Sequence, residues 1–265
     1  MSKRLENKIA VVIGAGQTPG DSIGNGRAIS VLFAREGAKV LLVDRVLEAA
    51  QDTRAQIEKD GGQATALEAD VTKSEDCGKI VEKCMGIYGR IDVFVYNVGT
   101  GDGYKSLEMP DSRWDTVFDV NLKGLYRMYK HVIPVMEKQE SGVLVNISSI
   151  AAISSTPMLA YRSSKAGMNA LTKSIAVQYA PKGIRANAIM PGLMNTPMAI
   201  EGITKSIGME KNDLIARRDK AVPLKGGMGS AWDVAYAALF LASDEAKFIS
   251  GVILPIDGAQ SSRVG

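Results

Sequence analysis

The chain has few residues that carry thiol or imidazole chemistry. Among its 265 residues there are two cysteines and one histidine. Cys77 and Cys84 are seven residues apart and form no CxxC pair, so we expect buried or half-buried thiols on a helix, as in a reducing cytosol. A single histidine, His131, excludes a histidine-rich metal site and argues against a Ser-His-Asp hydrolase. We therefore expect no metal site and a structural role for His131.

Long apolar runs and blocks of one charge are also missing. The longest apolar run, "VAYAALFLA" from Val234, is far shorter than the ~20 residues that a membrane span needs. The N-terminal "MSKRLENKIA" has no apolar run before the first expected strand. The 32 basic and 29 acidic residues are spread along the chain, without the basic block of a nucleic-acid surface. These features predict a soluble, cytoplasmic protein with neither membrane nor nucleic-acid partners.

No linker, repeat or composition shift divides the chain. Seven short, mostly apolar runs alternate with stretches of helical periodicity, which predicts a parallel sheet with right-handed crossovers. The expected fold is α/β: a single-domain (1–265), Rossmann-type, doubly wound, seven-stranded parallel sheet with helices on both faces. The expected strands are "KIAVVI", "AKVLLVD", "ATALEAD", "RIDVFVYN", "GVLVNIS", "IRANAIM" and "GVILPID". Ligands of such sheets lie beyond the carboxyl ends of the strands.

A glycine-rich loop, "GAGQTPGDSIGNG" at 14–26, follows the first expected strand. At Gly14 a tight turn without a Cβ lets the backbone approach a pyrophosphate and directs the next helix N-terminus at it. Asp44 ends the second strand, where a carboxylate accepts both ribose hydroxyls and repels a 2′-phosphate. This pattern favours NAD over NADP, although the adjacent Arg45 weakens the preference for NAD. The alternative for Asp44 is a helix N-cap. The next two loops offer contacts over the adenine and ribose, namely Asp70, Val71, Asn97 and Gly99.

Several motifs appear in a fixed order. They are "YNVG" at 96–99, "NLKG" from Asn121, "NISS" at 146–149, "YRSSK" at 161–165, "PGLMNT" at 191–196 and "ISGVILPIDG" at 249–258. Over essentially its full length the chain resembles the classical short-chain dehydrogenases/reductases. The resemblance implies hydride transfer between a nicotinamide cofactor and a small alcohol or ketone. It also implies a homo-oligomer, commonly a tetramer formed through the long helices and the C-terminal segment.

The glycine-rich loop departs from the family pattern, Gly-x3-Gly-x-Gly. Nine residues separate Gly14 from "GNG" at 24–26, and two interpretations are possible. In the first, "GNGRAIS" starts the helix and "QTPGDS" is an inserted flap. In the second, which we favour, a Ser-Ile pair meets the pyrophosphate, as in the similar loop of enoyl-carrier-protein reductases. The predicted contacts of this loop are Gly14, Ser22, Ile23, Gly24 and Gly26.

Tyr161 and Lys165 are four residues apart in a helical stretch, so their side chains share one face. A free tyrosine titrates near pH 10, and a shift of about three units would need roughly 4 kcal/mol from nearby positive charge. Tyr161 is the expected acid/base for the alcohol proton, and the resemblance implies that Lys165 also holds the nicotinamide ribose. The Tyr-Lys spacing argues against enoyl reduction, because enoyl reductases of the similar kind place more residues between the two.

Two further positions complete the predicted catalytic set. Ser149 follows the fifth strand and can hold the substrate oxygen, with Ser148 as the alternative because the segment to Tyr161 is one residue short of the commonest family spacing. Asn121 matches the family residue that holds a water in the proton relay. The family's carboxamide-binding loop corresponds to Pro191, Gly192, Met194 and Thr196.

Residues 193–229 are charged, methionine-bearing and poorly periodic, and we expect them to form the substrate lid. Predicted apolar contacts are Met194, Met198 and Met209, and Tyr104, Met109 and Met158 are expected to line the pocket. Lys205, Lys211, Arg217 and Arg218 either meet an anionic substrate or form a solvated helix face. The expected substrate is a secondary alcohol or ketone. The alternatives are an NADPH-dependent 3-oxoacyl-carrier reductase and a dinucleotide-binding protein without catalysis.

Overall fold

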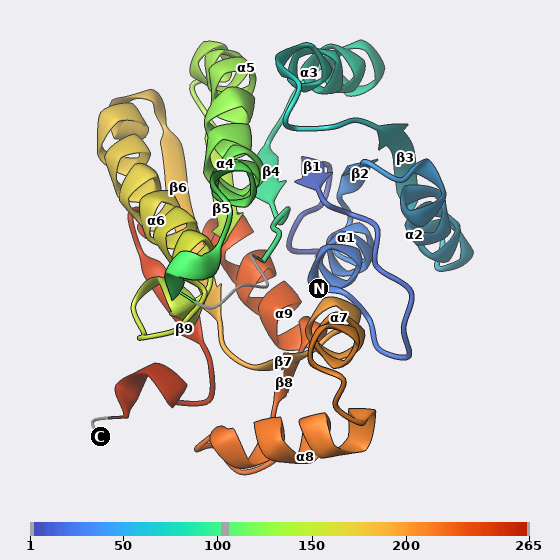
Figure 1. The fold of residues 1–265 in the computed structure, drawn as a ribbon. Helices are drawn as coiled ribbons and strands as arrows, with labels where there is room; N and C mark the ends of the chain where they lie inside the picture. Colours follow the sequence, from blue (N-terminus) through green and yellow to red (C-terminus); the bar gives the residue numbers. More distant parts are fainter. Residues whose placement is uncertain (1–2, 102–105, 264–265) are drawn as a thin grey trace.

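A computed structural model describes residues 3–101 and 106–263. Its central sheet has seven parallel strands in the order β3-β2-β1-β4-β5-β6-β9 (Figure 1). All seven predicted strands are present, and the predicted fold class is confirmed. The strands are β1 (Ile9–Ile13), β2 (Lys39–Asp44), β3 (Gln63–Glu68), β4 (Val93–Tyr96), β5 (Gly142–Ile147), β6 (Ile184–Pro191) and β9 (Ile253–Ile256).

Helices connect the strands and cover both faces of the sheet. They are α1 (Asn25–Arg35), α2 (Leu47–Lys59), α3 (Ser74–Tyr88), α4 (Asp111–Phe118), α5 (Gly124–Gln139), α6 (Leu159–Tyr179), α7 (Pro197–Ile207), α8 (Lys211–Ala221) and α9 (Ala231–Ala242). A π-helical turn, Asp119–Lys123, joins α4 to α5. Within the described ranges, no helix is both long and apolar enough to span a bilayer.

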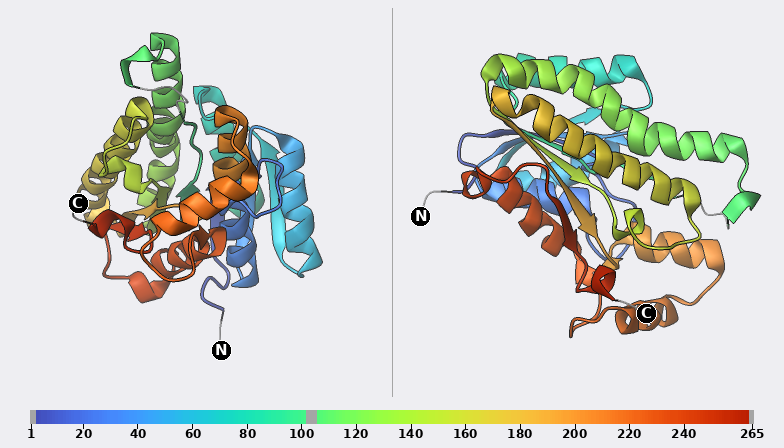
Figure 2. Two further views of the ribbon diagram at one scale, coloured as in Figure 1. Left: turned by 60° about the horizontal axis from the view of Figure 1, so that its bottom comes forward. Right: turned by 90° about the vertical axis from the view of Figure 1, so that its left-hand side faces the viewer.

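The core has two layers, because successive residues of a strand point to opposite faces. Ala10 and Val12 of β1 belong to the cluster formed with α1, α2 and α9. Val11 and Ile13 belong to the other cluster, formed with α3, α5 and α6. In the right-hand view of Figure 2, α5 and α6 lie on one side of the strands and α9 on the other. Burial on both faces explains why the central strands are almost entirely apolar.

The strand order reverses between β1 and β4, which places a switch point at the carboxyl edge of the sheet. The loops after β1, β4, β5 and β6 all leave the sheet at this edge. The interval 193–229 contains α7, α8 and two short strands, β7 (Met194–Asn195) and β8 (Gly229–Ser230), which pair in parallel. The sequence pattern predicts none of these elements, since the helices are poorly periodic and the strands have two residues each.

Candidate active site

The turn after β1 brings helix α1 directly against the end of the strand. Gly14 has a φ of +77°, and its N–H donates to the carbonyl of Val43 at 2.8 Å. A Cβ at Gly26 would lie 1.8 Å from the carbonyl oxygen of Gly14, so no side chain fits at position 26. This close approach of helix and strand is the geometry that a pyrophosphate at a helix N-terminus requires.

Helix α1 begins at Asn25, with Gly24 at the N-cap and no capping side chain among the described residues. Its first N–H groups are therefore left for another acceptor. The helix start agrees with the first interpretation of the loop. It also leaves Ser22 and Ile23, both half-buried, next to the N-terminus of helix α1, as the second interpretation requires. Their contact with a phosphate stays a prediction.

Gln17 holds the loop in shape and was not among the predicted residues. Its Oε1 accepts a hydrogen bond from the N–H of Gly24 at 3.0 Å, and its Nε2 donates to the carbonyl of Ser22 at 3.3 Å. These two bonds close the segment between residues 17 and 24 into a ring. A lone glutamine inside a loop carries no motif, so nothing in the sequence marks this role.

Asp44 lies at the end of β2 with its carboxylate turned toward the glycine-rich loop. Oδ2 accepts from the N–H of Gly16 at 3.0 Å, and Oδ1 accepts from the N–H of Val46 at 3.1 Å. The N-cap of α2 is Val46, so the N-cap alternative for Asp44 is wrong. The half-buried carboxylate retains lone pairs for two further donors, as ribose recognition would need.

The loops after β3 and β4 place the other predicted cofactor residues. Asn97 Nδ2 donates to the carbonyl of Gly14 at 2.9 Å, which joins the two sides of the switch point. Asp70 Oδ1 accepts from the N–H and the hydroxyl of Thr72. The Val71 side chain is buried in the core, so only its backbone can meet a ligand. A cavity of about 460 Å³ next to this region is lined by Arg45, Glu68, Ala69, Asp70, Lys73 and Asp76.

Tyr161, Ser149 and Lys165 lie together at the carboxyl edge. A hydrogen bond joins the side chains of Tyr161 and Ser149; burial raises the pKa of Tyr161, and this bond opposes the rise. Ser149 Oγ accepts from the N–H of Ala151 at 3.1 Å, so its proton can be donated to Tyr161 or to a substrate oxygen. The Lys165 Nζ lies 5.8 Å from the centre of the Tyr161 ring.

Lys165 is 3% exposed. Its Nζ donates to the carbonyl of Ile147 at 2.7 Å, and desolvation lowers the pKa of the ammonium to about 7. Gly99 makes room for it, because a Cβ there would lie 3.2 Å from Nζ. The lysine is thus fixed between the ends of β4 and β5, beside the tyrosine.

The two adjacent serines after β5 have different surroundings. Ser148 is 3% exposed, and its hydroxyl donates to the carbonyl of Lys165 at 3.2 Å. Ser149 is half-buried and bonds to Tyr161. These contacts favour Ser149 over Ser148 as the serine of the site.

Asn121 is fully buried in the π-helical turn. Its Oδ1 accepts from the N–H of Thr100 at 2.8 Å, and its Nδ2 donates to the carbonyl of Thr100 and to Ser164 Oγ, each at 3.0 Å. The side-chain amide thus makes three hydrogen bonds within the protein, and its contact with a relay water stays a prediction. Thr100 and Ser164 were not predicted; neither stands out in the sequence.

The loop after β6 carries the predicted carboxamide contacts. Pro191 ends the strand, and Gly192 packs so tightly that a Cβ would lie 2.3 Å from Gln260 Oε1. Met194 is buried in the core cluster of α1 and α9. Thr196 is 7% exposed and is the N-cap of α7, without a side-chain capping bond.

The structure gives fewer contacts for the predicted pocket and lid residues. Met109, Met158 and Met209 are half-buried and Met198 is 51% exposed. Arg217 is exposed, and Arg218 Nε donates to Met228 Sδ at 3.2 Å. Lys211 is paired with acidic side chains. Tyr104 and the side chain of Lys205 lie outside the described residues.

The remaining singled-out residues lie away from the site. His131, on α5, faces α3, where its ring lies 3.5 Å from the place of a Cβ at Gly78. Cys77 and Cys84 are free and buried, which confirms the prediction of buried thiols. Burial raises their pKa values to about 11 and about 12, so both remain protonated at neutral pH.

Comparisons with known proteins identify the family of the chain. The family model described as enoyl-(acyl carrier protein) reductase matches residues 20–259. The 3-oxoacyl-[acyl-carrier-protein] reductase FabG of Thermotoga maritima is 36% identical and covers 96% of this chain and 98% of its own. The 3beta-hydroxysteroid dehydrogenase 1 of Eggerthella lenta is also 36% identical, covering 98% and 96%. A Burkholderia xenovorans structure described as a short-chain dehydrogenase/reductase has a TM-score of 0.93, with 38% identity over 99% of this chain and 100% of that chain. The chain belongs to the short-chain dehydrogenase/reductase family of oxidoreductases.

Proposed function

We propose that this protein transfers a hydride between NAD(H) and a secondary alcohol or ketone. The observation that carries the proposal is the hydrogen bond between Tyr161 and Ser149 beside the buried ammonium of Lys165. A phenol, a hydrogen-bond donor and a cation at one sheet edge are the groups needed to hold a substrate oxygen and move its proton.

The residues at the carboxyl edge fit a dinucleotide. Gly14 and Gly26 form a cradle that a Cβ would fill, and the uncapped start of α1 offers N–H groups to the pyrophosphate. Asp44 would accept the ribose hydroxyls of the adenosine half. The rest of the dinucleotide would contact Asn97, Gly99 and the loop at 192–196. When bound, the nicotinamide supplies the carbon that accepts or donates the hydride.

The protein residues then handle the substrate oxygen. Ser149 donates a hydrogen bond to that oxygen, and Tyr161 takes the hydroxyl proton in oxidation or gives it in reduction. Burial keeps Tyr161 protonated in the protein alone. A positive charge close to the ring must therefore favour the phenolate during alcohol oxidation, and Lys165 is placed to provide or share that charge.

Asp44 supports NAD as the cofactor. A carboxylate at the end of β2 would repel the 2′-phosphate of NADP, and it already faces the loop that would contact the ribose. Arg45 is exposed next to it and would weaken this discrimination.

A 3-oxoacyl-carrier reductase is the second candidate, favoured by the relative from Thermotoga maritima that carries this name. The relative named as a 3beta-hydroxysteroid dehydrogenase instead supports a secondary alcohol. Asp44 argues against the NADPH-dependent alternative. Enoyl reduction, which the matching family description names, is disfavoured by the four-residue step from Tyr161 to Lys165.

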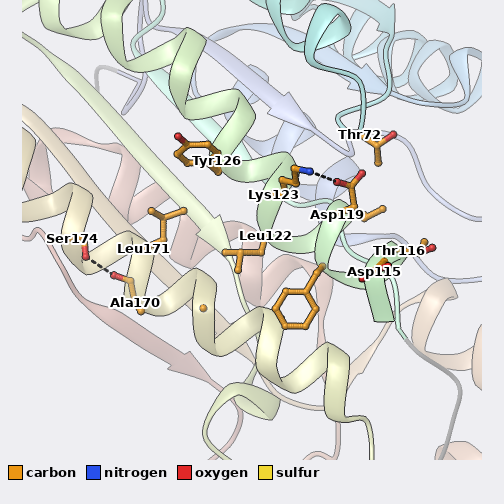
Figure 3. A pocket seen from close by; sticks show the side chains of 13 residues that line it. Thr72, Asp115, Thr116, Asp119, Leu122, Lys123, Tyr126, Ala170, Leu171 and Ser174 are labelled. Atoms are coloured by element: carbon orange, nitrogen blue, oxygen red, sulfur yellow. Dashed lines mark hydrogen bonds and ion pairs between the residues drawn. The ribbon is translucent and has the colours of Figure 1, made fainter. Parts of the chain in front are cut away.

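We further propose that the protein assembles with a second copy of itself through α5 and α6. A groove of about 1080 Å³ lies between α6 and the segment that runs from α4 through the π-helical turn to the start of α5, with Leu122, Tyr126 and Leu171 along it (Figure 3). Trp114, Tyr126 and Val177 are exposed on the same helical layer at 38%, 54% and 78%. Apolar patches of this kind mark association surfaces. A Tyr126→Glu variant is expected to shift the sedimentation coefficient to a smaller species; an unchanged value would contradict this interface.

The first experiment is NADH formation from NAD by the purified protein across a panel of secondary alcohols, with Tyr161→Phe measured in parallel. Turnover that disappears in the variant would support both the reaction and the base. NADH binding without turnover of any alcohol, ketone or 3-oxoacyl thioester would favour the remaining alternative, a dinucleotide-binding protein without catalysis.

A further inference from the structure

Three charged side chains connect segments that are far apart in the sequence. The Lys211 Nζ lies 2.5 Å from Asp21 Oδ2 and 3.0 Å from Glu201 Oε1. The N–H of Asp21 also donates to Glu201 Oε1 at 3.4 Å. We call Asp21, Glu201 and Lys211 the latch.

The latch joins the glycine-rich loop to the lid. Asp21 is at the exposed tip of the loop between β1 and α1, whereas Glu201 lies on α7 and Lys211 is the first residue of α8. Figure 1 shows this loop extending from the sheet edge toward α7. The two joined segments follow β1 and β6, on the two sides of the switch point.

The loop is shaped for this contact. A Cβ at Gly20 would lie 2.7 Å from the Glu201 carboxyl carbon, so a glycine allows the carboxylate to lie against the loop backbone. Glu201 is 19% exposed and Asp21 is 91% exposed. Glu201 Oε2 is buried and has no hydrogen-bond partner among the described residues. Lys211 therefore neutralises the charge of Glu201, a carboxylate that is largely shielded from water, and also that of Asp21 at the surface.

We infer that Lys211 is a positioning residue that holds the glycine-rich loop and the lid closed together over the dinucleotide. The inference rests on the proposed function, because it assumes that this loop contacts the cofactor. Asp21 supplies the loop's half of the contact and Glu201 the lid's half. Release of the dinucleotide then requires the latch to open.

The test is the dissociation rate of NADH, measured by stopped-flow fluorescence on displacement with excess NAD. Lys211→Met is expected to release NADH about two- to fivefold faster, the range that corresponds to an exposed ion pair. Asp21→Asn should give a smaller increase, and Lys211→Arg should restore the wild-type rate. Lys220→Met is the matched control, since Lys220 is exposed on the same helix and its loss changes the net charge equally.

The steady-state pattern separates positioning from general damage. The KM for NAD should rise in Lys211→Met, while the single-turnover rate of hydride transfer at saturating NAD stays at the wild-type value. High salt should reduce the difference between the two proteins, because exposed charges are screened.

The outcomes distinguish the two levels of the proposal. Equal NADH release from Lys211→Met and Lys220→Met would overturn the latch and leave the proposed function intact. Failure of the wild-type protein to bind NADH at all would overturn the proposed function, and the latch with it.

Discussion

The hydroxyl of Tyr96 donates a hydrogen bond of 2.5 Å to the carbonyl oxygen of Val120, the residue before Asn121. Tyr96 is fully buried at the end of β4, and Val120 belongs to the π-helical turn. Gly124 leaves space for the hydroxyl, because a Cβ there would lie 2.5 Å from the Tyr96 oxygen. One strand end thus fixes the irregular turn that carries a predicted catalytic residue.

Replacing Tyr96 with phenylalanine should therefore affect both stability and turnover. The carbonyl of half-buried Val120 would lose the hydrogen bond from Tyr96, at a cost of about 0.5–1.5 kcal/mol in the free energy of unfolding. Asn121 would be held less firmly, and kcat should fall with little change in KM. Urea unfolding and steady-state kinetics test this; wild-type values in both would contradict the role given to Tyr96.

Removing the Tyr161 hydroxyl should abolish proton transfer. Tyr161→Phe is expected to lower kcat by about 10²–10⁴-fold, the usual contribution of a positioned acid/base, and to bind NADH as the wild type does. Tyr179→Phe, at the other end of α6, is the matched control and should retain activity. A Tyr161→Phe enzyme with half the wild-type rate would refute the mechanism.

Lys165 should make stability depend on pH. Its pKa in the folded protein is about 7 instead of 10.5, so between these values the unfolded chain binds more protons and stability rises with pH. Lys165→Met lacks this group. Its free energy of unfolding should exceed that of the wild type most at and below pH 7, and the difference should shrink by up to about 5 kcal/mol toward pH 10.5. Urea unfolding of both proteins across this range is the measurement, and a constant difference would show that folding does not lower the pKa of Lys165.

Asp44 should control the choice of cofactor. Asp44→Asn removes the repulsion of a 2′-phosphate, so affinity for NADPH relative to NADH should rise by at least about tenfold. Glu48→Gln, an exposed change of equal charge on α2, should leave the ratio unchanged. Fluorescence titrations with NADH and NADPH measure this ratio of affinities. An unaltered ratio in Asp44→Asn would place the discrimination elsewhere.

Gly26 should tolerate no side chain. In Gly26→Ala the Cβ would overlap the Gly14 carbonyl, and overpacking of this kind costs about 1–3 kcal/mol or more. Gly202→Ala is the matched control: it lies in α7 with nothing within 4 Å of its Cβ position, so alanine should be neutral or stabilising by up to about 1 kcal/mol. Equal stability of the two variants would contradict the tight packing at α1.

The sequence was sufficient for the sheet and for the position of the catalytic candidates, because both depend on local patterns. Apolar runs mark strands buried on both faces, and a Tyr-x3-Lys step on a helix places two side chains together wherever the helix lies. Long-range partners carry no such pattern. Thr100 and Ser164 surround Asn121, and Gln17 closes its loop, through contacts that only the folded chain brings about.

The lid illustrates the same limit. The sequence predicts an irregular excursion from 193 to 229, and its charged residues were interpreted either as a solvated face or as anion contacts. Lys211 instead pairs with two carboxylates of the protein itself. Because Asp21 is 190 residues away in the chain, no local pattern relates the two side chains.

The difference between Ser148 and Ser149 follows from counting along β5. The ladder continues one residue past the strand, since the N–H of Ser148 donates to the carbonyl of Ile189 at 2.7 Å, and neighbouring residues of an extended chain face opposite ways. Whether a serine hydroxyl points into the core or into the cleft thus depends on whether its position along the strand is odd or even. Deleting one residue of β5 before Asn146 would exchange the two roles without changing the letters of the motif, provided that the residues ahead of the deletion keep their register. Every strand residue after the deletion would then change faces as well.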